Sequence, residues 1–488
     1  MLFPTITFAV FFLVVYVANW ALMPRPRLWK QAIIVASCVF YGWWDWRLIF
    51  LLLGATLVNQ ALGVRVYRAA GGRGGRRPAA RPWLMLAVAV NLATLGVFKY
   101  FDFFALSLNG VLAAFGLGAP LPLLRIALPV GISFLVFRML TYVIDIYRGQ
   151  LMPAPALDFA VYTVFFPYLL AGPIARAREF LPQLREPRDP RAVDSSRAFV
   201  LILGGLVKKL LIADYLSTHI VGGLFASPQT YSSWETFWGI LAYSVQIYCD
   251  FSAYSDIAIG IALLLGFELP DNFAAPYAAR TIQDFWRRWH ITLSSWLRDY
   301  LYIPLGGNRK GRGRTYANLV LTFLLGGLWH GAGWTFVFWG LLHGVGLAVE
   351  RARMDARRSR GLPEPGATAG GRALQHLGVF AFVSLAWVFF RAESLGNAVA
   401  VLWRLVAGLG SLGTAVTLPV MALCVLGVAV QYVPRRGVEA LEAGFSRIGW
   451  AGQGVALALA LFLIDMLGPA GSEERRVGKE CVQPCRSR

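Results

Sequence analysis

The sequence predicts an all-α polytopic membrane protein, and three observations lead to that prediction. Of the 488 residues, 57% are hydrophobic and only 15% are charged, a composition too apolar to cover a soluble surface. The apolar residues form runs long enough to cross a hydrocarbon layer about 30 Å thick. Basic residues gather in short clusters between these runs, as expected for loops on the cytoplasmic side.

The net charge of +20 would also suit a nucleic-acid-binding protein. The basic residues are divided among short clusters between apolar segments, however, and do not share one soluble face. Membrane topology therefore explains the charge better, and we expect no nucleic-acid partner. If every cluster faces the cytoplasm, the intervening segments cross in pairs. The clusters are Arg25–Lys30, Arg65–Arg81, Arg176–Arg197, Arg309–Arg314, Arg351–Arg360 and Arg435–Arg447.

Apolar runs predict about eleven crossings within a single transmembrane domain at residues 1–467. The predicted crossings are Pro4–Leu22, Leu28–Trp44, Leu48–Val64, Trp83–Phe104, Leu128–Tyr147, Phe199–Leu216, Trp238–Leu265, Trp334–Val349, Leu374–Phe390, Val416–Val433 and Trp450–Leu467, with Thr315–Trp329 descending into the membrane. Asp158–Gly172 is short and interrupted by proline, so we expect it to be re-entrant. Ile282–Tyr300 carries aromatic residues on one face and charges on the other, which predicts an interfacial helix.

Two polar stretches and a tail complete the organisation. Glu350–Arg372 is too polar to cross and is expected to be a cytoplasmic linker. In residues 468–488 the composition changes, and Ser472–Cys481 resembles the translation of a sequencing-adapter read-through, so we expect a disordered tail outside the fold. Three of the five cysteines, at 38, 249 and 424, stand singly in apolar segments. We therefore expect neither a disulfide framework nor a metal site.

Two aspartates lie inside a predicted crossing, where neither is expected to face lipid. Asp250 and Asp256 belong to the polar stretch Y-C-D-F-S-A-Y-S-D at residues 248–256. Buried polar side chains commonly join transmembrane helices to one another. The alternative is that these carboxylates line a reaction chamber.

A histidine at membrane depth is the strongest functional signal in the chain. His330 lies in Gly326–Gly344, G-G-L-W-H-G-A-G-W-T-F-V-F-W-G-L-L-H-G. Because a histidine is costly in hydrocarbon and can exchange a proton near neutral pH, it is a functional candidate. The other interpretation is a core histidine bonded to a backbone carbonyl. His343, thirteen positions later, falls on another helix face and is expected to bond locally.

The two longest motifs resemble the membrane-bound O-acyltransferase family. They are Gly326–Gly344 and Trp286–Asn308, W-R-R-W-H-I-T-L-S-S-W-L-R-D-Y-L-Y-I-P-L-G-G-N. The shorter phrases Tyr41–Arg47, Phe98–Phe104 and Leu128–Phe134 resemble the bacterial branch that O-acetylates exported polysaccharides such as alginate. The resemblance covers residues 1–467. It implies helices arranged around a central funnel in the bacterial inner membrane.

The resemblance implies a catalytic His330 and a second functional histidine, His290. An imidazole suits acyl transfer from a thioester to a hydroxyl, because a base must accept the hydroxyl proton. An interfacial ring without a catalytic role is the alternative for His290. Further candidates along the substrate tunnel are Trp329, Trp334, Asp250, Asp256 and Asn308.

No bound cofactor is expected, and acetyl-CoA is the donor that the resemblance implies. The loop Gly306–Arg312 contains Arg309, Lys310 and Arg312, which suit donor phosphates. The same loop is also explained as an ordinary cytoplasmic basic loop. The resemblance implies a polysaccharide acceptor reached through a periplasmic or membrane-anchored acetyltransferase partner.

The sequence is also compatible with three other functions. The D-alanyl transferases that modify teichoic acid share both histidine motifs. A polytopic transporter without covalent chemistry would show two related halves with interrupted helices, and no such repeat is apparent. A scaffold that only recruits periplasmic enzymes would not need His330.

Overall fold

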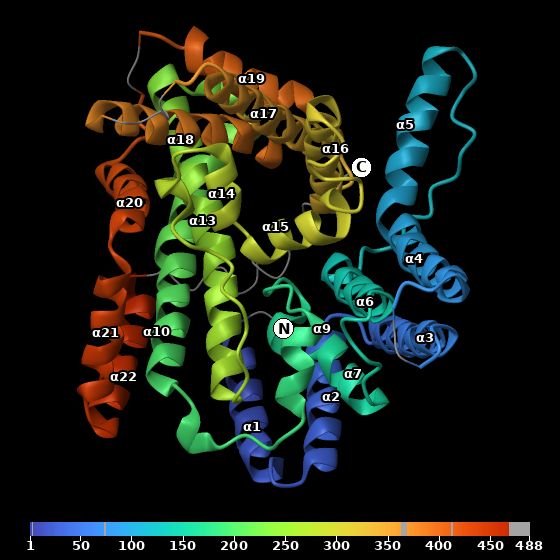
Figure 1. Cartoon of the computed structure of the whole chain (residues 1–488). Coiled ribbons are helices and arrows are strands. Elements are labelled where there is room, and N and C mark those ends of the chain that lie inside the picture. The colour runs from blue at the N-terminus through green and yellow to red at the C-terminus, as the bar shows by residue number, and fades with distance from the viewer. Residues whose placement is uncertain (2, 73–74, 363–367, 411–412, 468–488) are drawn as a thin grey trace. The chain divides into compact units, whose positions relative to one another are not determined.

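A computed structural model describes residues 1–467 except residues 2, 73–74, 363–367 and 411–412 (Figure 1). All regular secondary structure in the described part of the chain is helical, which confirms the all-α prediction. The chain divides into two compact units. Unit 1 contains residues 1–202 and 257–270, and unit 2 contains residues 203–256 and the chain from 271 onward. The predicted tail at 468–488 lies outside the described residues, and the single domain and central funnel stay predictions.

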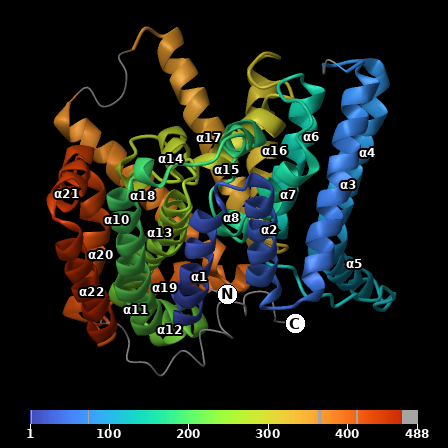
Figure 2. The same cartoon turned by 90° about the horizontal axis from the view of Figure 1, so that it is seen from below.

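The helices of unit 1 follow the predicted runs closely. The run Trp83–Phe104 is divided by a π-helical turn, η2 (Gly96–Tyr100). The principal helices are α1 (Ile6–Leu22), α2 (Pro26–Gly42), α3 (Arg47–Ala69), α4 (Arg81–Leu95), α5 (Phe101–Ala114), α6 (Ile132–Tyr147), α7 (Ala156–Val164), α8 (Phe166–Leu169), α9 (Ala177–Phe180) and α10 (Ser195–Leu206), the last of which continues into unit 2. Helices α3 and α4 lie side by side (Figure 2). Asn91 on α4 donates to Asn59 on α3 over 2.7 Å.

The predicted re-entrant segment is broken as its prolines suggest. Helix α7 ends at Val164, and the short helix α8 begins at Phe166. Arg138 on α6 is fully buried and donates to the backbone carbonyls of Thr163 (3.4 Å) and Tyr168 (3.1 Å). A helix break leaves carbonyls without intrahelical partners, which is costly away from water. The buried guanidinium therefore stabilises the break.

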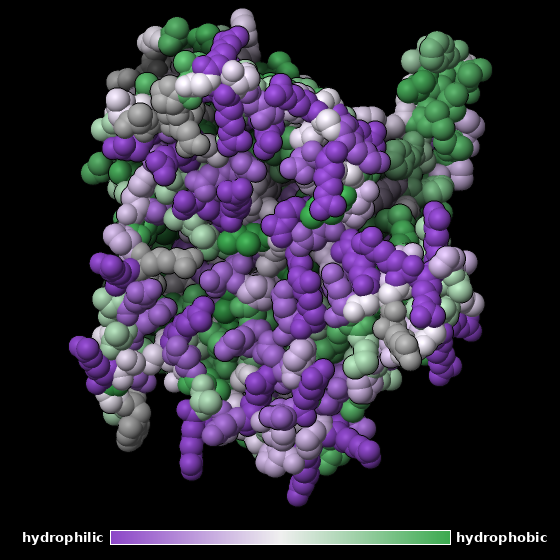
Figure 3. Space-filling view, viewed as in Figure 1, coloured by the Kyte–Doolittle hydropathy of each residue, from purple (hydrophilic) through white to green (hydrophobic). Residues whose placement is uncertain are grey.

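Four helical segments among the described residues are long and apolar enough to cross a bilayer: Arg47–Ala69, Pro78–Ala114, Ser233–Leu264 and Ala369–Arg391. Shorter apolar helices are Ile6–Leu22, Leu395–Ala407, Leu418–Tyr432 and Ala451–Ile464. The surface of α5 is largely hydrophobic (Figure 3), with large apolar side chains exposed at Phe104, Leu108 and Val111. Such a surface suits lipid contact. Four such segments do not establish eleven crossings, so that number stays a prediction.

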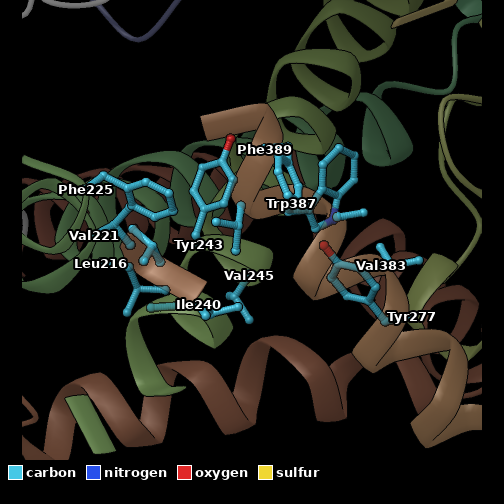
Figure 4. Packing of buried hydrophobic residues seen from close by; sticks show 14 of the residues in the cluster. Leu216, Val221, Phe225, Ile240, Tyr243, Val245, Tyr277, Val383, Trp387 and Phe389 are labelled. Atoms are coloured by element: carbon cyan, nitrogen blue, oxygen red, sulfur yellow. The ribbon is translucent and has the colours of Figure 1, made fainter. Parts of the chain in front are cut away.

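Unit 2 carries the two histidine motifs. Its helices are α11 (Asp214–Leu216), α12 (Gly222–Ala226), α13 (Ser233–Leu264, which ends in unit 1), α14 (Ile282–Arg288), α15 (Ile291–Leu297), α16 (Arg312–His330), α17 (Trp334–Ser359), α18 (Ala369–Arg391), α19 (Leu395–Ala407), α20 (Leu418–Ala429), α21 (Arg435–Arg447) and α22 (Trp450–Leu467). The core packs Tyr243 and Val245 of α13 near Val383, Trp387 and Phe389 of α18 (Figure 4). This core supports both motifs.

Two sequence predictions in unit 2 are wrong. Ile282–Tyr300 is not one interfacial helix, because the backbone turns at Trp289–His290 between α14 and α15. Glu350–Arg372 is not entirely a linker, because α17 continues to Ser359. Its charged residues are good helix formers, and Arg351 pairs with Asp355 one turn later at 3.2 Å. Polarity excluded a crossing there but did not exclude a helix.

Glycines bring α16 and α17 into close backbone contact. A Cβ at Gly340 on α17 would meet the Phe323 carbonyl and approach the Cα of Gly327, on α16, to 3.1 Å. A Cβ at Gly344 would approach the Cα of Val320 to 2.8 Å. Small residues allow such packing between membrane helices. The contact holds the end of α16, and hence His330, against α17.

The first testable prediction concerns this contact. Gly340→Ala should destabilise the protein by about 1–3 kcal/mol, because the added methyl group must displace backbone atoms. Gly378→Ala on α18 is the matched control, since a Cβ there meets nothing within 4 Å. Thermal unfolding in detergent should show a lower midpoint only for Gly340→Ala. Equal midpoints for the two variants would contradict the packing argument.

The aspartates of α13 are paired with lysines of a π-helical segment, η5 (Val207–Ala213), that follows α10. Lys208 contacts Asp256 and also donates to Ser252 over 3.0 Å. Lys209 lies 2.8 Å from Asp250 and 2.6 Å from Asp214. These ion pairs support the interpretation that the polar stretch joins two helices.

The second prediction tests one of these pairs. Asp256→Leu should destabilise the protein by about 1–3 kcal/mol, because it leaves a largely buried ammonium without its carboxylate. The double variant Lys208→Met/Asp256→Leu removes both charges and should recover most of that loss. Thermal unfolding of the two variants and the parent in one detergent measures the difference. If the double variant is no more stable than Asp256→Leu, the Lys208–Asp256 ion pair does not stabilise the contact between the two helices.

Candidate active site

His290 lies at the turn that separates α14 from α15. Its backbone is left-handed, with φ 43° and ψ 56°, a conformation that a residue with a Cβ rarely adopts. On one side of the turn the Ala274 amide donates to the Arg288 carbonyl over 2.9 Å, and on the other the Ile291 amide donates to the Asn272 carbonyl over 2.9 Å. Two backbone hydrogen bonds therefore enclose the strained residue.

His330 is the last residue of α16. Gly331 and Gly333 are extended, with φ of −155° and −162°, and α17 begins at Trp334. A Cβ at Gly331 would overlap the ring of Phe336, so a glycine is required for the close turn. The break predicted at these two glycines is confirmed. It places His330 at the end of a helix, where its side chain is partly exposed.

The structure brings the two predicted histidines together. The ring centroids of His290 and His330 are 6.4 Å apart. His290 is completely buried and meets the ring of Phe251 edge to face at 4.5 Å, whereas His330 is partly exposed. The two imidazoles therefore lie in one site but differ in access.

Aromatic rings enclose the pair. Trp329 lies 6.1 Å from His290 and 4.9 Å from His330, measured between ring centroids. Trp339 and Phe390 meet the ring of His330 edge to face at 5.1 Å and 5.2 Å. Aromatic walls of this kind exclude water and lower the local dielectric constant, which strengthens electrostatic interactions inside the site.

Burial controls the charge of His290, which lies outside the four candidate spans. Burial, with a smaller contribution from the nearby His330, lowers the pKa of His290 well below its ordinary value. A lowered pKa favours the neutral imidazole at pH 7. In that form the ring carries one N–H donor and one nitrogen acceptor.

The remaining tunnel candidates have different environments. Trp329 is buried beside both histidines, whereas Trp334 is 55% exposed. Trp339, which sequence reasoning did not single out, contacts His330 instead. The available signal was the break at Gly331 and Gly333, because a helix returning along α16 brings its second turn back to the level of His330. Asp250 and Asp256 are held in the lysine ion pairs described above.

His343 is bonded within the protein core, but its partner is on another helix and not local in the chain as expected. It is fully buried, and its Nδ1 accepts a hydrogen bond from Trp286 Nε1 over 3.2 Å. A nitrogen that accepts from an indole N–H carries no proton, so the neutral ring has its proton on Nε2. His343 therefore connects α14 with α17.

One of the three donor-phosphate candidates, Arg312, and the tunnel candidate Asn308 line a surface cavity of about 190 Å³. Asn308 and Arg312 line it together with Gly311, Thr315, Arg351 and Asp355. Arg309 and Lys310 are exposed and do not belong to its lining. The two residues from α17 were missed because Glu350–Arg372 was interpreted as a linker. Among the described residues, no cluster of three or more histidine, cysteine or acidic side chains suits a metal ion.

Comparison with known proteins gives a consistent result. The model of the membrane-bound O-acyltransferase family matches residues 133–390, which include both histidines. The chain is 43% identical over 418 residues to a probable alginate O-acetylase of Azotobacter vinelandii, covering 85% of this chain and 79% of the relative. It is 38% identical over 406 residues to a peptidoglycan O-acetyltransferase of Helicobacter pylori, covering 77% and 73%.

A teichoic acid D-alanyltransferase of Streptococcus thermophilus is more distant. It is 28% identical over 248 residues, covering 47% of this chain and 58% of the relative. The O-acetyltransferases therefore match a larger part of the chain at higher identity. The fold, the paired histidines and these similarities lead to one conclusion: the chain belongs to the membrane-bound O-acyltransferase family and is a multi-pass membrane O-acyltransferase.

Proposed function

We propose that this protein moves an acetyl group from a cytoplasmic thioester donor, acetyl-CoA, across the bacterial inner membrane to O-acetylate an exported polysaccharide such as alginate. The observation that carries the proposal is the pair of imidazoles with centroids 6.4 Å apart inside an aromatic enclosure. The names of the two O-acetyltransferase relatives support acetyl as the group and an exported glycan as the acceptor.

His330 is the proposed general base. A hydroxyl oxygen attacks the thioester carbonyl while the imidazole of His330 accepts the hydroxyl proton. The tetrahedral intermediate then collapses, the carbon–sulfur bond breaks, and the protonated imidazole returns its proton to the departing thiolate. Partial exposure of His330 suits this role, since the base must meet the hydroxyl group directly.

His290 is proposed to support the same step without serving as the first base. Its centroid lies 6.4 Å from that of His330, so the two rings are close enough to act on the same reacting group. A neutral imidazole with one N–H can donate to the oxygen that becomes negative in the intermediate. Preorganised donors of this kind stabilise the transition state.

Donor phosphates are proposed to bind at the cavity lined by the first residues of α16. Arg312 and Arg351 face this cavity together with Asn308. Guanidinium groups form charge-assisted hydrogen bonds with phosphate oxygens. Arg309 and Lys310 would add attraction from the surrounding surface without direct contact. A donor entering here arrives from the basic side of the chain, as a cytoplasmic donor must.

The acceptor is proposed to approach from the periplasmic side. A periplasmic or membrane-anchored acetyltransferase partner would receive the acetyl group on a hydroxyl and pass it to the polysaccharide. Acetyl-CoA would remain in the cytoplasm, and only the acyl group would cross. D-alanyl transfer to a teichoic-acid-like polymer is the second candidate, favoured only by the weaker similarity over about half of the chain.

The third prediction tests the base. His330→Ala should lower acetyl transfer by about 10²–10⁴-fold, the range typical of a general base. The assay measures radiolabelled acetyl groups transferred from acetyl-CoA by the protein in inverted inner-membrane vesicles that contain the partner acetyltransferase. His219→Ala is the matched control, because that imidazole is exposed and stacks on Tyr215 outside the site. Full activity of His330→Ala, with normal insertion, would reject the assignment.

The fourth prediction tests the donor cavity. Arg312→Ala should raise KM for acetyl-CoA roughly tenfold while leaving kcat nearly unchanged, because a lost charge-assisted hydrogen bond weakens ground state and transition state alike. Arg309→Ala, on the same loop but outside the cavity, is the control and should change KM little. If a D-alanyl thioester is used and acetyl-CoA is not, the alternative donor class replaces this one. An unchanged KM for Arg312→Ala would mean that the donor phosphates do not bind in this cavity.

A further inference from the structure

We propose that Asn272 is a positioning residue that holds His290 in its strained turn and thereby sets the separation of the two imidazoles. This inference rests on the proposed function only for its catalytic consequence. The structural part concerns how one buried amide fixes the backbone on the C-terminal side of His290.

The side chain of Asn272 is 1% exposed and makes three hydrogen bonds. Its Oδ1 accepts from the backbone amide of Thr292 (3.3 Å) and from the Thr292 hydroxyl (2.9 Å). Its Nδ2 donates to Ser255 Oγ over 3.1 Å. Its backbone carbonyl accepts from the Ile291 amide over 2.9 Å. The two residues that follow His290 are therefore bound directly to Asn272.

These hydrogen bonds stabilise a part of the backbone that is unfavourable without them. A left-handed backbone is unfavourable for a residue with a Cβ, so it persists only when surrounding contacts determine it. The amides of Ile291 and Thr292 also lie in the first turn of α15, where amides lack intrahelical partners. Asn272 supplies those partners through one carbonyl and one side-chain oxygen. Asn272 therefore stabilises both the first turn of α15 and the left-handed turn at His290.

The other side of Asn272 is anchored to α13. Ser255 lies one turn after Phe251, whose ring meets His290 edge to face at 4.5 Å. One helix therefore contacts His290 directly through Phe251 and indirectly through Ser255 and Asn272. The polar stretch of α13 therefore has a second structural role in addition to its ion pairs with the lysines. It orients the buried imidazole.

The test uses the full chain in detergent and diethyl pyrocarbonate, which modifies accessible neutral imidazoles. Asn272→Leu retains the size of the side chain but removes its hydrogen bonds. We expect modification of His290, measured by peptide mass spectrometry, to rise about tenfold as the turn opens locally. Buried His343 reports general loss of structure, and exposed His219 reports reagent activity. His290 and His343 both remaining protected would overturn the proposal.

If Asn272→Leu also exposes His343, that variant has lost structure generally, and two milder variants, Asn272→Asp and Thr292→Val, then test the proposal. Asn272→Asp retains an acceptor for Thr292 and should protect His290 better than Asn272→Leu does. Thr292→Val removes the hydroxyl bond to Asn272 and keeps the backbone amide bond, and it should increase modification of His290 while His343 stays protected. If Thr292→Val leaves His290 as protected as in the parent chain, Asn272 does not hold the turn through Thr292, and the proposal fails.

Acetyl transfer then separates positioning from the proposed catalysis. Thr292→Val should lower kcat about tenfold with KM for acetyl-CoA unchanged, because a displaced catalytic group affects the transition state alone. His290→Ala tests the proposed function. If His290→Ala retains full kcat while Thr292→Val still exposes His290 to the reagent, the catalytic role fails and the positioning role stands. If both variants retain full kcat and His290 stays protected in Thr292→Val, both roles fail.

Discussion

The close contact between α16 and α17 is the constraint on which the candidate site depends. The backbones of the two helices approach each other at Gly327, Gly340 and Gly344. Between the helices, Gly331 and Gly333 are extended and let the chain reverse direction within a few residues. In a lipid environment the hydrophobic effect provides little force between helices, so packing at short range must supply it. The same contact brings Trp339 back to His330. Without this contact between the helices, the ring of His330 at the end of α16 would lose the aromatic side chain of Trp339 beside it.

The second motif depends on hydrogen bonds more than on packing. The turn at His290 contains no glycine, yet its backbone is left-handed. Bonds from Asn272 and Ala274 hold it, and the first turn of α15 continues from it. The two histidines are therefore fixed by different physical means, one by close glycine packing and one by a buried polar network. Their separation is the joint result.

Much of this was predictable from composition and local pattern. Apolar runs gave the helical class and most helix positions in unit 1, and the glycines after His330 predicted the break that is observed. The motifs identified both histidines. The interrupted helix at Ile282–Tyr300 was missed because its amphipathic spacing continues across the turn. The length of α17 was underestimated because Glu350–Arg372 is too polar to cross the membrane and was therefore interpreted as a linker, whereas the helix continues to Ser359.

The sequence by itself determined where many helices stop, because hydrophobic runs and glycines act over a few neighbouring positions. It also supplied the candidate site residues, since both histidines lie in motifs that resemble those of the family. Tertiary structure decided which of these residues meet. It paired Asp250 and Asp256 with lysines, placed Trp339 beside His330 while Trp334 stayed exposed, and bound Asn272 to Thr292. Such pairings join residues far apart in the chain, and periodicity along one segment contains no information about the partner.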